Sequence, residues 1–157
     1  MTNANKTPSP QLAAGFEMRS APRCMTRDRM RWYVDAQATV AADDGLHHNG
    51  GPTIHDDDDY AKSQGLPGII ADGMVSTNWL LDLLLNTFGS DFLRDGSLST
   101  KYIAPIYENQ MVISCARVNT VEHMQDGSTR YLLDVWCEDD KELKLTVGKA
   151  STFTVGL

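Results

Sequence analysis

Residues 73–88, which read GMVSTNWLLDLLLNTF, decide the fold of this chain. Apolar side chains recur there at helical spacing, at Val75, Trp79, Leu80, Leu83, Leu84 and Phe88. Leu81 and Leu85 carry the apolar surface beyond a single stripe, which is typical of a helix buried on more than one side. We therefore predict a long central helix that begins at Gly73.

Two shorter helices are predicted before the central one. Thr26 suits the N-cap of the first helix, and Met30 and Tyr33 share one of its faces. The aspartates Asp56–Asp59 suit the positive end of the second helix dipole, and Gly65 ends that helix.

The last third of the chain changes to β-branched and aromatic residues. Residues 111–118, 129–137 and 143–155 are predicted strands, separated by turn-forming residues. Residues 97–104 form a further strand, which Pro105 closes. A long helix followed by an antiparallel sheet that wraps it gives the α+β class.

The size of the chain suits one domain. It has 157 residues, of which 41% are hydrophobic, so it is long enough for one core and too short for two ordinary domains. We expect residues 1–14 to be a flexible tail and residues 15–157 to form the domain. The net charge of -7 argues against nucleic acid as a partner.

Neither a membrane anchor nor a disulfide framework is expected. The most apolar stretch, residues 79–85, is interrupted by Asp82 and falls short of the roughly 20 residues that span a bilayer. The N-terminus has no apolar segment typical of a secretory signal. The 3 cysteines form no CxxC pair and leave one over, which favours a reducing, cytoplasmic location.

The densest polar cluster is residues 47–59, HHNGGPTIHDDDD. A loop histidine such as His55 is a candidate general acid or base, because imidazole titrates near neutrality. The alternative is that these histidines are ordinary loop residues. The aspartates Asp56–Asp59 match no metal-binding pattern, so a solvated helix start is favoured over a metal site.

The start of the central helix is a second candidate site. The first N–H groups of a helix lack partners within it, and Gly73 lets a ligand approach that backbone closely. A developing oxyanion can be stabilised there. The alternative is that Asp72 is simply an N-cap and that Gly73 relieves packing.

Two segments resemble a known family. Residues 54–74, IHDDDDYAKSQGLPGIIADGM, and residues 102–109, YIAPIYEN, resemble the MaoC-like (R)-specific enoyl-CoA hydratases and dehydratases. The resemblance spans about residues 26–155. It implies a hotdog fold and the reversible addition of water to an α,β-unsaturated acyl thioester, with no metal and no organic cofactor.

The resemblance also assigns roles to residues. His55 matches the catalytic histidine of the family, and Gly73 matches the backbone amide that binds the thioester oxygen. The family's loop aspartate has no match, and Asn49 is the nearest polar residue. Asparagine cannot take a proton. We therefore expect Asp72, at the same helix start, to replace the carboxylate; Asp43–Asp44 are the alternative.

Further residues of the helix are candidates for substrate binding. Met74 is expected to line an acyl tunnel, and Ser76 and Asn78 are expected to bind an oxygenated acyl chain. The alternative is that Met74 is core and that the two polar side chains bond to the helix backbone.

Several functions therefore remain compatible with the sequence. The first is a hydratase or dehydratase of an acyl-CoA or acyl-carrier-protein thioester. Others are a thioesterase, isomerase or cyclase on the same fold, or a non-catalytic subunit of a hetero-oligomeric hydratase. Hotdog domains pair, so we expect a homodimer or an assembly of dimers.

Overall fold

The computed structural model describes residues 11–34 and 52–155. The elements in chain order are β1 (Glu17–Arg19), β2 (Arg23–Cys24), α2 (Asp58–Ser63), α3 (Gly73–Phe88), α4 (Ser90–Asp95), β3 (Ser97–Tyr102), β4 (Met111–His123), β5 (Ser128–Asp139) and β6 (Lys144–Val155). Residues 27–34, between β2 and α2, are helical as well.

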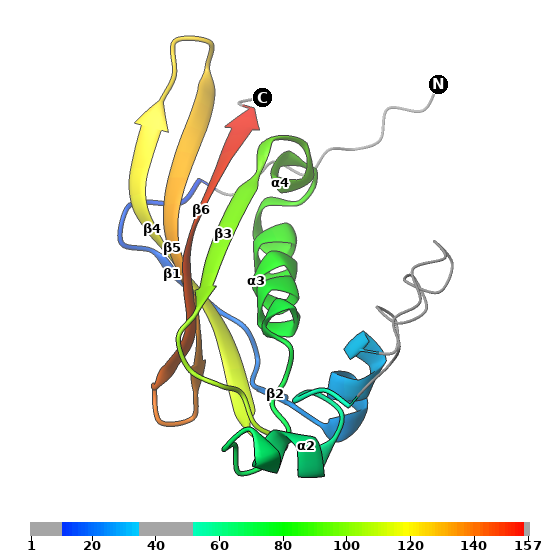
Figure 1. Ribbon diagram of the computed structural model, residues 1–157. Helices are drawn as coiled ribbons and strands as arrows, with labels where there is room; N and C mark the ends of the chain where they lie inside the picture. Colours follow the sequence, from blue (N-terminus) through cyan, green and yellow to red (C-terminus); the bar gives the residue numbers. More distant parts are fainter. Residues whose placement is uncertain (1–10, 35–51, 156–157) are drawn as a thin grey trace, which may run out of the picture.

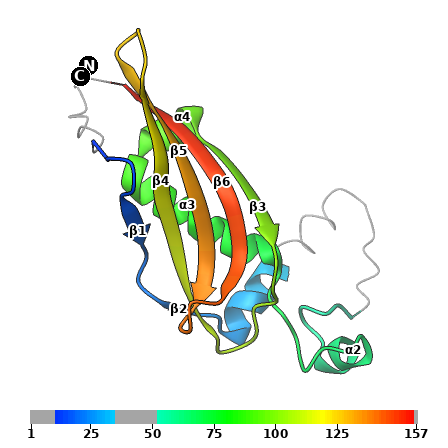
Figure 2. The same cartoon turned by 90° about the vertical axis from the view of Figure 1, so that its left-hand side faces the viewer.

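The strands form one antiparallel sheet in the order β1-β4-β5-β6-β3, and β2 pairs with β4 beyond the end of β1. The sheet curves along α3, which lies lengthwise against one of its faces, and α2 lies beyond one end of the sheet (Figures 1 and 2). The α+β prediction, with a long helix wrapped by an antiparallel sheet, is confirmed.

The core lies between α3 and the sheet. Val75, Leu80, Leu84 and Phe88 of α3 are buried, and Trp79 and Leu83 are partly buried beside them. Their partners from the sheet include Val118, Tyr131, Leu133, Val135 and Leu145, all at most 2% exposed. The helical spacing of apolar residues therefore predicted the buried face of α3 correctly.

The first short helix begins after its predicted capping residue, Thr26, and α2 begins within the run Asp56–Asp59 that was expected at its positive end. The Thr26 hydroxyl accepts a hydrogen bond from the Arg29 N–H at 3.3 Å, and Met30 is fully buried. In α2 the N-cap is Asp57, whose carboxylate accepts the Tyr60 N–H at 2.7 Å. Gly65, just after α2, has the positive φ of 84° that favours glycine.

All four predicted strands differ from the prediction in their bounds. β5 runs over Ser128–Asp139 where residues 129–137 were predicted, and β6 begins at Lys144 where residue 143 was predicted. β4 continues past residue 118 to His123, across a register shift at Asn119. β3 ends at Tyr102 and not at residue 104, because the N–H groups of Ile103 and Ala104 both donate to the Leu145 carbonyl, at 2.9 and 3.1 Å. Helix α4 was not expected.

A bulge in β6 explains why one carbonyl receives both donors. Cys137 pairs with Thr146 and Glu138 pairs with Lys144, so Leu145 is an extra residue without a partner on β5. The bulge brings the end of β3 and the following residues against β6. Tyr102, Ile103 and Ala104, at and after the end of β3, line the cavity described below.

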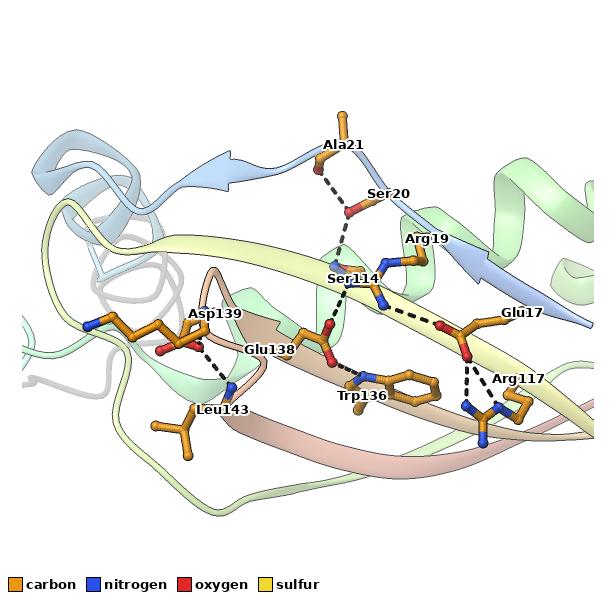
Figure 3. A network of polar contacts seen from close by, with 11 residues as sticks. Glu17, Arg19, Ser20, Ala21, Ser114, Arg117, Trp136, Glu138, Asp139 and Leu143 are labelled. Carbon is orange, nitrogen blue, oxygen red and sulfur yellow. Dashed lines mark hydrogen bonds and ion pairs between the residues drawn. The ribbon is translucent and has the colours of Figure 1, made fainter.

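The face of the sheet that points away from α3 carries paired charges. The Cys137 thiol donates to the Ser76 carbonyl of α3 at 3.7 Å, so Trp136 and Glu138 on either side point to the opposite face. Figure 3 shows the Glu138 carboxylate between the Arg19 guanidinium and the Trp136 indole N–H. The Glu138 side chain is only 6% exposed, and both of its oxygens have donors.

The boundary predicted at residue 15 remains a prediction, since residues 1–10 lie outside the described part of the chain. Leu12, which the prediction assigns to the tail, packs against the core, and its N–H donates to the Tyr131 hydroxyl at 3.4 Å. Within the described ranges, no helix is long and apolar enough to cross a membrane.

Candidate active site

A cavity of about 590 Å³ gathers four of the residues singled out from the sequence. His55, Asp72, Gly73 and Ser76 all line it. They come from two segments, because His55 precedes α2 and the other three belong to the start of α3.

The remaining lining is largely apolar and was not predicted as part of a site. It consists of Leu66, Ile70, Ala71, Tyr102, Ile103, Ala104, Pro105, Ile106 and Thr146. Residues 102–106 belong to one of the two segments that carry the family resemblance, and that was the only signal for them. Thr146 had no signal, because its position depends on the bulge at Leu145.

Local hydrogen bonds hold His55 beside the start of α3. The Ile70 N–H donates to the Ile54 carbonyl at 3.0 Å, and the Ile70 carbonyl lies 2.8 Å from His55 Nδ1. The next residue, Ala71, donates its N–H to the Ile106 carbonyl at 2.8 Å. The histidine and the helix start are therefore both tied to residues 70–71.

The contact with Ile70 determines the tautomer of His55. A carbonyl oxygen only accepts hydrogen bonds, so Nδ1 must carry the proton. In neutral imidazole this leaves Nε2 as the basic nitrogen. His55 is half-buried in the cavity lining, where Nε2 can take a proton from a ligand or a water molecule.

Gly73 is the first residue of α3, so its N–H has no hydrogen-bond partner within the helix. Among the described residues, no group accepts a hydrogen bond from this N–H. The positive end of the helix dipole adds to its attraction for a negatively charged oxygen.

Glycine is required at position 73 by the ring of Tyr102. A Cβ atom built there would lie 2.5 Å from Tyr102 Cδ2, closer than real Cβ contacts. The Tyr102 hydroxyl donates to Met74 Sδ at 3.1 Å and lies 2.9 Å from Thr77 Oγ1. The aromatic ring therefore packs directly on the start of α3.

The position of Asp72 is compatible with both roles considered from the sequence, as the N-cap of α3 and as a carboxylate of the active site. Its Oδ1 accepts the Met74 N–H at 2.8 Å, so it is the N-cap of α3. The same residue lines the cavity. Its second carboxylate oxygen is not used by the cap.

Two other predicted residues, Met74 and Asn78, are described and do not line the cavity. Met74 is 42% exposed and its sulfur accepts the Tyr102 hydroxyl, and Asn78 is exposed. Asn49, like the alternative carboxylates Asp43 and Asp44, lies outside the described residues.

The four consecutive aspartates each have a different environment. Asp56 accepts the N–H and the hydroxyl of Thr53, both at 2.8 Å. Asp57 is the helix cap, Asp58 pairs with Arg27, and Asp59 is exposed. Within residues 11–34 and 52–155, no three His, Cys, Asp or Glu side chains converge as metal ligands would.

Arg27 fastens the segment that carries His55 to the rest of the domain. Its guanidinium binds Asp58 of α2 at 2.8 Å and Glu108, after β3, at 2.5 Å. Hydrogen bonds from Arg27 lower the pKa values of both carboxyls. Because Arg27 already has two carboxylate partners, it is not a free cation for a ligand phosphate.

A larger hollow, of about 670 Å³, lies on the other face of the sheet. Its lining includes Arg19, Arg117 and Glu138, whose charges are paired within the protein. None of the described residues that were predicted as catalytic or substrate-binding lines it. The smaller cavity is therefore the candidate active site.

Comparisons with solved structures give the same fold at low sequence identity. The MaoC-like dehydratase from Rhodospirillum rubrum matches with a TM-score of 0.70 and 13% identity, over 93% of this chain and 94% of that one. The (R)-hydratase from A. caviae involved in PHA biosynthesis matches with a TM-score of 0.67 and 15% identity, over 94% and 100%.

A third match is a two-component enzyme. The HadBC complex of Mycobacterium tuberculosis, a 3R-hydroxyacyl-ACP dehydratase, matches with a TM-score of 0.64 and 11% identity, over 89% of this chain and 96% of that one. No family model and no curated protein matches the sequence. The resemblance read from the residues is thus confirmed at the level of the fold: the chain has the hotdog fold of MaoC-like dehydratases and (R)-hydratases.

Proposed function

We propose that the chain is a hydratase or dehydratase that acts at the α,β position of an acyl thioester. One observation carries the proposal: a histidine with its Nδ1 proton bound to a backbone carbonyl shares a cavity with the first N–H of α3, which has no acceptor among the described residues. The fold shared with MaoC-like dehydratases and (R)-hydratases supports it.

In the hydration direction, His55 Nε2 takes a proton from water as the water oxygen bonds to the β carbon. The electron pair of the double bond moves toward the thioester carbonyl, and the Gly73 N–H stabilises the negative oxygen. The His55 imidazolium then returns its proton to the α carbon. Dehydration follows the same steps in reverse, so one histidine acts as base and then as acid.

Asp72 is proposed as the second polar group of the reaction. Its free carboxylate oxygen accepts a hydrogen bond from the reacting water, while the other oxygen caps α3. Asn49 remains the alternative for this role. The reaction uses no metal and no organic cofactor, because the proton transfers need only these side chains.

We propose a homodimer that forms through β3. This strand lies at the edge of the sheet and pairs with β6 only, among the described strands, so its outer backbone groups are open to a further strand. Met74, Tyr102 and Ile103 expose 42%, 45% and 51% of their surfaces around this edge. A second β3 would cover them beside the cavity. A cytoplasmic location remains a prediction.

The experiment compares the possible reactions on one set of substrates. Crotonyl-CoA, longer enoyl-CoAs and the same acyl groups on a carrier protein are incubated with the protein. Loss of the enone absorbance reports hydration, and release of free thiol reports hydrolysis. We expect hydration without thiol release. Thiol release would instead indicate a thioesterase, and a folded protein inactive on every thioester would indicate a non-catalytic subunit.

A further inference from the structure

Two buried hydroxyl groups interrupt the apolar wall of the candidate active site. Ser76 is fully buried, Thr146 is 1% exposed, and both line the cavity. Their oxygens lie 2.8 Å apart, and the Ser76 hydroxyl also donates to the Gly73 carbonyl at 2.7 Å. They lie on facing elements, α3 and β6.

The proton of each hydroxyl group can be assigned to one hydrogen bond, and this shows which acceptor is left unused. The Gly73 carbonyl can only accept, so it takes the Ser76 proton, and the Thr146 proton is then donated to Ser76 Oγ. No donor among the described residues reaches Thr146 Oγ1. The pair therefore presents an unused hydrogen-bond acceptor at the cavity wall.

The bulge in β6 fixes this acceptor in place. Thr146 pairs with Tyr102 on one side and with Cys137 on the other, and Cys137 contacts the Ser76 carbonyl of α3. Cross-strand partners point to the same face of a sheet. Thr146 therefore points toward α3 from a position set by both neighbouring strands.

We propose that Thr146 determines specificity, and that the acyl groups accepted here carry a hydroxyl beyond the β carbon whose proton is donated to Thr146 Oγ1. The inference rests on the proposed function, because the thioester carbonyl is taken to lie at the Gly73 N–H. Ser76 follows Gly73 by three residues, which is about 4.5 Å along a helix axis. An acyl chain with a hydroxyl a few carbons from its carbonyl is long enough to cover such a separation.

The test measures binding with ligands that cannot react. Amide analogues of hexanoyl-CoA, in which nitrogen replaces the thioester sulfur, are prepared unsubstituted and with a hydroxyl on the fourth, fifth or sixth carbon. Their dissociation constants are measured by calorimetry. We expect the unmodified protein to bind at least one hydroxylated analogue about tenfold more tightly than the unsubstituted one, as one neutral hydrogen bond allows.

Three variants show whether Thr146 is responsible. Thr146→Val should abolish the preference and leave binding of the unsubstituted analogue within about threefold. Thr146→Ser keeps the hydroxyl and should keep the preference. Thr152→Val is the matched control, since Thr152 is a fully buried threonine of the same strand that lies outside the cavity.

Equal binding of all analogues by the unmodified protein, or a preference that survives Thr146→Val, would overturn the inference, and so would the absence of any binding. The proposed function fails separately: a protein that binds with the expected preference but hydrates no enoyl thioester would contradict the reaction and leave the specificity of Thr146 standing.

Discussion

The reaction proposed here depends on two residues that are 18 positions apart and that the backbone of residues 70–71 brings together. His55 gains a defined tautomer from the Ile70 carbonyl, and Gly73 gains an open N–H from its place at the start of α3. Both are consequences of backbone geometry, so neighbouring residues can disturb them without touching the substrate.

Gly73 offers a test of that geometry. Gly73→Ala places a methyl group against the Tyr102 ring, and we expect a loss of about 1–3 kcal/mol of unfolding free energy, as for other overpacked sites. In a Tyr102→Ala background the clash is gone, so the same substitution should cost much less. Denaturant unfolding of the four proteins measures this coupling. Additive effects would show that the two residues do not press on one another.

The cysteines differ sharply in their environments. Burial raises the pKa of the Cys115 thiol to about 12 and that of Cys137 to about 11, whereas Cys24 is only half-buried. At pH 8 in the folded protein, we therefore expect one thiol per chain to react with a disulfide reagent and all 3 to react after unfolding. Fast reaction of a second thiol in the folded state would contradict the packing around β4 and β5.

Among helices and strands, the features that could be predicted are those set by residues close together in the sequence. The apolar spacing of residues 73–88 predicted α3, with Asp72 as a candidate N-cap, and the run of aspartates Asp56–Asp59 indicated where α2 begins. The bulge at Leu145 could not be predicted, because an inserted residue leaves the composition of the strand unchanged. Thr146 was missed with it. The Arg27 contacts were missed because their partners are 31 and 81 residues away.

The Arg27 contacts predict how stability depends on pH. Arg27 lowers the pKa values of Asp58 and Glu108 below their ordinary values of 3.8 and 4.5. The ion pairs therefore stabilise the folded state above those values, and the contribution is lost as the pH falls through the lowered ones. Unfolding measured between pH 7 and pH 3 should show a shallower acid loss in Arg27→Gln than in the unmodified protein.

The same variant should affect catalysis, because Arg27 holds the segment that carries His55. We expect turnover to fall about tenfold as the histidine loses its position. Arg130→Gln, which removes a comparable ion pair with Glu122 far from the cavity, is the control and should leave turnover unchanged. Equal losses in both variants would mean that Arg27 has no particular role in placing His55.

For the whole molecule, the open edge of β3 predicts the assembly. Light scattering after gel filtration should give twice the chain mass of 17.3 kDa. Ile103→Lys should shift the protein toward the monomer, because Ile103 is 51% exposed just after this edge. Leu143→Lys, at a 58% exposed residue between β5 and β6, is the control and should remain dimeric. A monomeric unmodified protein, or equal effects of the two lysines, would contradict pairing through β3.

The central claim is that His55 transfers the proton in a hydration reaction, and its most direct test is the turnover of enoyl-CoA by His55→Ala. The control is His123→Ala, which alters an exposed histidine at the end of β4. We predict that His55→Ala lowers kcat about 100- to 10,000-fold while the protein remains folded, as for the loss of a general acid or base. His123→Ala should match the unmodified protein. Full hydration activity in a folded His55→Ala protein would contradict the account.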